Sequence, residues 1–293
     1  MVRFKSFSTY YRYERVFVFK WYGYLGFALI MLSEINFAVR LQPFADWYLP
    51  IVWLGYILVT DSLVYGIRGR SLIASHPKEM LFIAIISVPF WLIFEAYNAY
   101  TMSWYYINYT WQVHIIDFAT ILPALMETFS LTNALGIGSR FDRRVPARQR
   151  SSSNLSVRAA VGALAAFGAF VSLFPFLYPR LGYFVMFFGL FLFLDPVNYL
   201  LGKPSVVRRV ATYGWGMIPR LFISGLVMGF FWEFWNYQAL PQWIYAIPVP
   251  FGFKLFEMPL WGYFGYLPFA MEAYVFVAFF VSFLFGKNEL ISM

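Results

Sequence analysis

Cysteine is absent from this 293-residue chain, and charged residues are scarce. Without cysteine the chain can form no disulfide, thiolate metal site or cysteine nucleophile. Histidine occurs only at His76 and His114, which leaves no histidine cluster for a metal, so we expect neither a metal nor a cofactor. Charged residues make up 12% of the chain, about half of what a soluble domain carries. These shortages argue against a soluble protein.

Apolar residues are abundant instead: 61% of the chain is hydrophobic and 24% is aromatic. Several apolar runs reach the roughly 20 residues that cross a bilayer core as a helix. The sequence therefore predicts an all-α, polytopic membrane helix bundle with eight spans. We expect these spans at residues 18–39, 47–67, 80–100, 114–137, 157–178, 181–201, 217–237 and 263–286.

The basic residues are distributed unevenly between the two ends of these spans. All but three of the 22 Lys and Arg residues fall on the side of the N-terminus, and the exceptions are Arg40, Arg180 and Lys254. This bias predicts cytoplasmic N- and C-termini in a multi-pass protein of the cell (inner) membrane. It also accounts for the net charge of +8 without a nucleic-acid partner. Residues 1–17 are expected to lie on the membrane surface, and residues 140–156 to form a basic cytoplasmic linker.

One composite motif occurs twice: Glu-x-x-Asn, then Trp-x-Tyr six or seven residues after the Asn, then Leu-Pro-x-x-Met-Glu. Four spans per copy predict two parallel four-helix halves, residues 18–139 and 157–293, related by an approximate two-fold axis along the membrane normal. Both copies should then face one shared centre. The motif residues are Glu95, Asn98, Trp104, Tyr106 and Glu127 in the first half, and Glu233, Asn236, Trp243, Tyr245 and Glu272 in the second.

Four carboxyl groups of the repeat are expected to converge on a pocket in the outer leaflet. A carboxylate at bilayer depth is costly, so such residues face the bundle interior and are functional candidates. The alternative is structural, with each Glu joining helices through hydrogen bonds. Four neighbouring carboxyls cannot all be ionised in a low dielectric, so some should be protonated near neutral pH. Such an acid could also donate to a backbone carbonyl freed by Pro123 or Pro268.

A buried acid beside aromatic faces suits the protonation of an alkene, because aromatic quadrupoles stabilise the resulting carbocation. We expect Glu233 and Glu95 to act as proton donor and partner, and Glu127 and Glu272 to form the second pair. Asn98 and Asn236 would orient them. The expected substrate-binding residues are these two asparagines together with Trp232, Trp235, Trp243, Tyr245, Trp104 and Tyr106. Most other aromatic residues are interpreted as core filler and interfacial belt.

Other acidic residues have plainer interpretations. Asp61 and Asp195 lie towards the cytoplasmic ends of their spans and are interpreted as structural. His114 and Asp117, three residues apart, have no counterpart in the second half and are expected to fix a loop rather than relay protons. Glu34 also lacks a counterpart, so a functional Glu34 would make the site asymmetric.

The segment around residues 229–270 resembles a group of membrane carotenoid enzymes. Glu233-x-x-Asn236, Trp243-x-Tyr245 and the run from Gly252 through Leu255–Leu260 to Pro268 carry the resemblance. They are similar to motifs of the integral-membrane carotenoid hydratases and the heterodimeric-type lycopene cyclases. The resemblance implies a metal-free, acid-initiated reaction on a polyene end group. It departs from the cyclases at Trp261-Gly262, where they carry a Glu-Glu doublet.

Three hypotheses follow. The first is an acid–base enzyme, a cyclase or a hydratase, acting on an isoprenoid or carotenoid-like lipid. The second is a non-catalytic lipid-binding or anchoring subunit, which would have a membrane protein partner or form a homo-oligomer. The third is a proton-coupled carrier, which would require helices broken at mid-membrane.

Overall fold

The computed structural model describes residues 16–143, 155–247 and 252–286, and the chain in these ranges is a helix bundle. Nearly all of segment 1–17, most of linker 140–156 and the C-terminus lie outside the described residues. Within them, seven helices are long and apolar enough to cross a membrane. Six are α1 (Trp21–Val39), α2 (Tyr48–Arg68), α4 (Pro77–Thr101), α5 (Trp111–Ala134), α6 (Leu155–Leu177) and α10 (Met217–Gln238), and the seventh comprises η3 (Leu260–Gly265) and α11 (Tyr266–Phe285).

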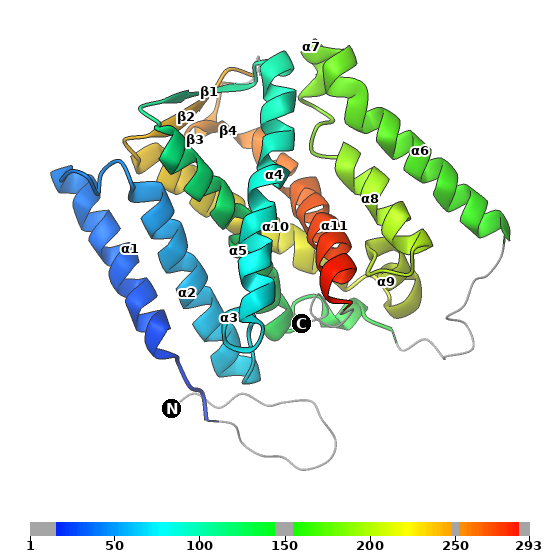
Figure 1. Ribbon diagram of the computed structural model, residues 1–293, viewed down its shortest axis with the longest axis horizontal. Coiled ribbons are helices and arrows are strands. Elements are labelled where there is room, and N and C mark those ends of the chain that lie inside the picture. Colours follow the sequence, from blue (N-terminus) through cyan, green and yellow to red (C-terminus); the bar gives the residue numbers. More distant parts are fainter. Residues whose placement is uncertain (1–15, 144–154, 248–251, 287–293) are drawn as a thin grey trace.

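Shorter elements connect these helices at the two ends of the bundle. Helix α7 and the strands gather at one end, and α3 and α9 at the other (Figure 1). Helices α4, α5, α10 and α11 form the centre, flanked by the α1–α2 pair on one side and by α6 with α8 on the other (Figure 1). The short elements are α3 (Leu72–Ser75), β1 (Trp104–Ile107), η1 (Ser139–Phe141), α7 (Pro179–Gly182), α8 (Gly189–Leu200), α9 (Val206–Tyr213), β2 (Gln242–Tyr245), β3 (Lys254–Leu255) and β4 (Met258–Pro259).

The continuous span expected at 181–201 is wrong. Helix α7 ends at Gly182, turns occupy 183–188, and α8 has only 12 residues. Such a helix is about 18 Å long, whereas the apolar core is about 30 Å thick. The carboxylate Oε1 of Glu272 accepts hydrogen bonds from the backbone N–H groups of Leu190 (3.0 Å) and Phe191 (3.4 Å). Glu272 therefore caps the start of α8, where N–H groups have no partner within the helix.

Asp61 and Asp195 have matching structural roles, as interpreted from the sequence. Asp61 accepts hydrogen bonds from the Ser71 hydroxyl and the Ile73 N–H, both at 2.8 Å, at the start of α3. Asp195 accepts from the Ser205 hydroxyl at 3.1 Å and from the Val207 N–H at 3.0 Å, at the start of α9. In each half the serine follows the aspartate by ten residues. Both aspartates thus cap a short helix from a neighbouring span.

The two repeated prolines differ in their effect. Pro123 lies inside α5, and the Ser87 hydroxyl of α4 accepts from the N–H of Leu122 and donates to the carbonyl of Phe118. A serine rather than a glutamate therefore satisfies the backbone beside this proline. Pro268 lies in the first turn of α11, where a proline interrupts no hydrogen bond within the helix. The expectation that Pro268 interrupts its helix and frees a backbone carbonyl is therefore wrong. Helix α5 continues through Pro123.

Replacing Glu272 tests its capping role. Glu272→Leu removes the acceptor of two buried N–H groups, and we expect it to lower the free energy of unfolding by about 1–3 kcal/mol. Glu272→Gln retains a carbonyl oxygen and should stay close to the unsubstituted protein. Thermal unfolding in detergent micelles measures both, and equal stability of the two variants would contradict the assignment.

Candidate functional site

A two-stranded antiparallel sheet joins the two copies of the repeated motif. Strand β1 pairs with β2 so that Trp104 lies opposite Tyr245, and Tyr106 opposite Trp243. Because alternate residues of a strand share a face, these four side chains lie on the same side of the sheet. The indole N–H of Trp104 donates to the Tyr106 hydroxyl at 3.2 Å, and the indole N–H of Trp243 donates to the Tyr245 hydroxyl at 3.0 Å. We call these four residues the aromatic platform.

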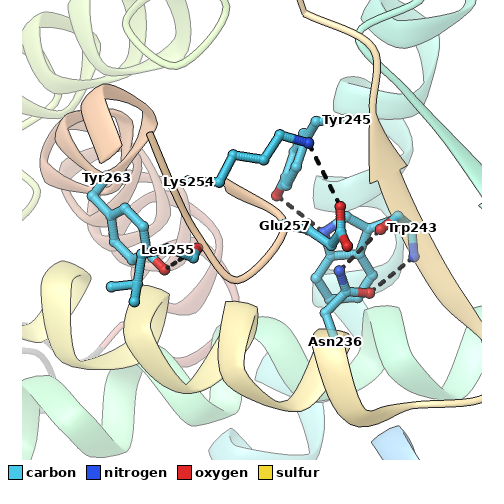
Figure 2. Close-up of polar contacts among 7 residues, drawn as sticks. All are labelled: Asn236, Trp243, Tyr245, Lys254, Leu255, Glu257 and Tyr263. Atoms are coloured by element: carbon cyan, nitrogen blue, oxygen red, sulfur yellow. Dashed lines mark hydrogen bonds and ion pairs between the residues drawn. The ribbon is translucent and has the colours of Figure 1, made fainter. Parts of the chain in front are cut away.

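The repeated asparagines hold this platform against the helices. The side-chain amide of Asn98 donates to the backbone carbonyl of Trp104 at 2.9 Å and accepts from the backbone N–H of Trp104 at 3.0 Å. Asn236 makes the same two bonds to Trp243, both at 2.9 Å (Figure 2). Each asparagine therefore continues the sheet edge as a peptide group would. Their role is to fix the strands, whereas the sequence predicted that they orient the carboxyl groups.

The platform tyrosines bind the first carboxyl group of each repeat. Tyr106 donates to Glu95 Oε1, which also accepts from the indole N–H groups of Trp91 (2.8 Å) and Trp104 (3.2 Å). Tyr245 donates to Glu233 Oε1 at 2.7 Å. Glu95 is half-buried and Glu233 is fully buried. The two halves thus carry the same Glu–Tyr pair.

Burial raises the pKa of the Tyr245 phenol well above its usual range, and the charge and hydrogen bond of Glu233 raise it further. The pKa of Tyr106 is raised in the same way, first by burial and then by Glu95. A phenol with a raised pKa keeps its proton at physiological pH. Both hydroxyls are therefore hydrogen-bond donors to their carboxylates over that range.

A cavity of about 370 Å³ lies under the platform and is lined almost entirely by aromatic side chains. Its volume falls within the range of small-molecule sites. Three of the lining residues are tyrosines whose hydroxyls donate to Glu95 or Glu233, namely Tyr106, Tyr245 and Tyr266. The lining also comprises Trp91, Trp104, Trp232 and Trp243, residues Tyr183, Phe184, Met186, Phe187 and Phe188 before and at the start of α8, and Met258, Trp261, Phe264, Pro268 and Phe269.

The rim of this cavity is apolar and exposed. Phe184, Trp261 and Phe264 line the cavity and are 64%, 62% and 60% exposed, respectively. They belong to the turn before α8 and to η3, at the end of the bundle that holds the strands. In a membrane-spanning bundle, irregular backbone at this depth is tolerated where it borders a cavity or protein. The short α8 therefore leaves room for an opening beside it.

The structure separates the predicted site residues into two groups. Of the predicted substrate-binding residues, Trp104, Tyr106, Trp232, Trp243 and Tyr245 line the cavity. Trp235 faces α1 instead and donates to Glu34 Oε1 at 3.0 Å. The cavity lining includes none of the four predicted catalytic carboxyls, Glu95, Glu127, Glu233 and Glu272. The expected convergence of four carboxyls on one pocket is wrong: Glu95 and Glu233 lie directly behind the tyrosines, and Glu272 caps α8.

Glu127 is the counterpart of Glu272, but no capping role is open to it. It is fully buried, and neither of its oxygens has a hydrogen-bond partner among the described residues. Helix α2, which corresponds to α8, is continuous from Tyr48 to Arg68. In the first half, α2 therefore offers Glu127 no counterpart of the α8 start that Glu272 caps.

Tyr266 is a site residue that the sequence did not reveal. Its hydroxyl donates to Glu233 Oε1 at 2.5 Å, and its ring lines the cavity. The ring packs on Gly229, where an added Cβ would lie 2.4 Å from it. In the first half, Trp91 stands where Gly229 does, four residues before the repeated Glu, and Ile121 stands where Tyr266 does, two residues before the repeated Pro. These two differences between the copies were the sequence features that could have indicated Tyr266.

The segment that carries the family resemblance forms a hairpin beside the cavity. Strands β3 and β4 pair with Lys254 opposite Pro259, and the Lys254 ammonium lies 3.7 Å from the Glu257 carboxylate (Figure 2). The Tyr263 hydroxyl donates to the Leu255 carbonyl at 3.2 Å (Figure 2). Phe256, at φ 58°, places its ring against Phe230 of α10. The hairpin is thus fixed to α10 on the side where Met258 and Trp261 line the cavity.

Gly229→Ala tests the close approach of Tyr266. We expect the new methyl group to displace the Tyr266 ring and to lower the free energy of unfolding by about 1–3 kcal/mol. Gly162→Ala in α6 is the matched control, because a Cβ there meets no atom within 4 Å. In a Tyr266→Ala background the cost of Gly229→Ala should largely disappear. An undiminished cost in that background, measured by denaturant unfolding, would show that Tyr266 is not the residue displaced.

Comparisons with protein-family models, with curated proteins and with solved structures found no match to this chain.

Proposed function

We propose that this protein is an integral membrane acid–base enzyme that protonates an alkene of an isoprenoid or carotenoid-like lipid. One observation carries the proposal: Tyr106, Tyr245 and Tyr266 line an aromatic cavity of about 370 Å³, and the last two donate hydrogen bonds to the buried carboxyl of Glu233. Such a wall accepts a hydrocarbon and stabilises a cation through aromatic faces. The exposed aromatic rim suits entry from the lipid phase.

The proposal includes an arrangement in the membrane. The two halves form parallel four-segment repeats around a two-fold axis through the β1–β2 pair, with α7–α8 as the interrupted second segment of the second half. The matching bonds of Asn98 and Asn236, and of Asp61 and Asp195, support this relation. The end with the strands faces outward and both termini face the cytoplasm, as the distribution of basic residues indicates.

Glu233 is the proton source in this mechanism. Its Oε1 lies 2.7 Å from the Tyr245 hydroxyl oxygen and 2.5 Å from that of Tyr266, while its buried Oε2 has no partner among the described residues. In the reactive form Oε1 carries a proton and donates it to the Tyr245 oxygen, whose own O–H points towards the alkene. The phenol proton then passes to an alkene carbon while the Oε1 proton replaces it on the phenol oxygen. The resulting carbocation then loses a proton after ring closure, or adds water and loses a proton. Either route returns one proton to the carboxylate.

The decisive experiment is mass spectrometry of isoprenoid lipids from a lycopene-making bacterial host that expresses the protein. A new product of unchanged mass indicates a cyclase, and a product heavier by one water indicates a hydratase. We expect Glu233→Gln to abolish the product, and Tyr245→Phe to reduce it at least tenfold, because each removes a step of the proton transfer.

Glu34→Gln is the matched control for this experiment. Glu34 accepts hydrogen bonds from Trp235 and Tyr48 and is not among the cavity residues, so this variant should retain the product. All variants are compared at equal membrane expression. Full product from the Glu233→Gln strain would rule out Glu233 as the proton source.

A second candidate function is lipid binding without chemistry, as a subunit of a membrane complex. The observation that favours it is the position of the carboxyls, none of which lines the cavity directly. It predicts a lipid that co-purifies with the protein and is unchanged by the Glu233→Gln substitution. The interrupted α7–α8 segment is also compatible with a carrier, whose uptake would collapse with the proton gradient.

A further inference from the structure

A second, much smaller cavity lies next to the main one. Its volume is about 20 Å³, which is enough for one water molecule, since about 10–15 Å³ is required. Tyr106, Trp91, Trp232 and Trp243 line both cavities and form the wall between them. The smaller cavity also contains Asp117 of α5.

Asp117 has one oxygen to offer a ligand in this cavity. Its side chain is buried, with 8% exposed, and its Oδ2 accepts from the Tyr109 hydroxyl at 3.1 Å. Its Oδ1 is buried and has no hydrogen-bond partner among the described residues. A buried acceptor without a hydrogen-bond partner is destabilising, and more so if it is charged. A water molecule in the cavity removes that destabilisation.

The groups around Asp117 connect the outer end of the bundle with the Glu–Tyr pair of the first half. The His114 ring centre lies 4.3 Å from those of both Tyr109 and Tyr106. His114 is half-buried, and its Nε2 has no hydrogen-bond partner among the described residues. Tyr106 in turn donates to Glu95. The titratable residues that line this cavity are Asp117, Tyr109 and Tyr106. His114 lies against both tyrosine rings, and Glu95 lies behind Tyr106.

We propose that the smaller cavity binds one water molecule on Asp117, and that Asp117 and this water form a proton relay to the Tyr106–Glu95 pair. At each step one O–H bond breaks as the next O–H bond forms, so the relay moves a proton and needs no redox partner. For Asp117 this goes beyond the expectation that it only fixes a loop. It does not depend on the identity of the lipid or on the proposed reaction.

The relay is tested on the full-length protein in lipid nanodiscs by infrared difference spectroscopy between two pH values, in H₂¹⁶O and H₂¹⁸O. We expect a water O–H band that shifts with ¹⁸O and a pH-dependent band of a protonated carboxyl group. Asp117→Asn should remove the component of the carboxyl signal that belongs to Asp117, whereas a component from Glu233 should disappear only in Glu233→Gln. Ile121→Phe, which adds volume at the cavity wall and leaves Asp117 in place, should remove the water band but keep the Asp117 component.

Glu34→Gln should retain both bands, and thermal unfolding confirms that each variant is folded. If Asp117→Asn fails to fold, Ile121→Phe alone decides the water site. A carboxyl signal that is unchanged in Asp117→Asn, or a water band that persists in Ile121→Phe, would overturn the proposal. Because none of these readouts requires product formation, a missing lycopene product and a missing relay are separate outcomes.

Discussion

The structure depends on one constraint: within a lipid bilayer every backbone polar group needs a partner inside the protein. The bundle contains several places where a helix begins or bends in the interior, and each has a polar side chain assigned to it. Asp61 and Asp195 cap α3 and α9, Glu272 caps α8, and Ser87 bridges the backbone of α5 beside Pro123. Most buried polar residues of this chain therefore serve the backbone.

This constraint separates structural carboxyls from candidate functional ones. In the described part of the chain, Glu95 and Glu233 accept hydrogen bonds only from side chains. Each of them accepts one from a tyrosine of the platform. A capping carboxylate is held by N–H groups that cannot move without unfolding a helix turn. A phenol, in contrast, can exchange its proton and can rotate. Acid–base chemistry is therefore compatible with Glu95 and Glu233 but not with the position of Glu272.

The repeated motif was visible in the sequence, and its local contacts follow from spacing. Glu-x-x-Asn places both side chains on one helix face, and Trp-x-Tyr places both rings on one strand face, so the matched contacts of the two halves were within reach of prediction. The all-helical membrane fold was also predictable from apolar runs. The interrupted segment before α8 was not, because residues 181–194 contain no charged or amide side chain and the stabilising carboxylate comes from Glu272, about eighty residues later. Tyr266 was missed because its role depends on the space above Gly229.

The two halves then act as an internal comparison for the site. Both hold the same Glu–Tyr pair, but Trp91 in the first half donates to Glu95 from the position that Gly229 occupies in the second. Gly229 makes room for Tyr266, and the broken segment before α8 opens the space under it. In the first half, α2 is continuous, and a cavity of about 20 Å³ lies beside Asp117. The two copies of the motif thus differ in two features: Gly229 stands where the first copy has the indole of Trp91, and α8 is shorter than α2.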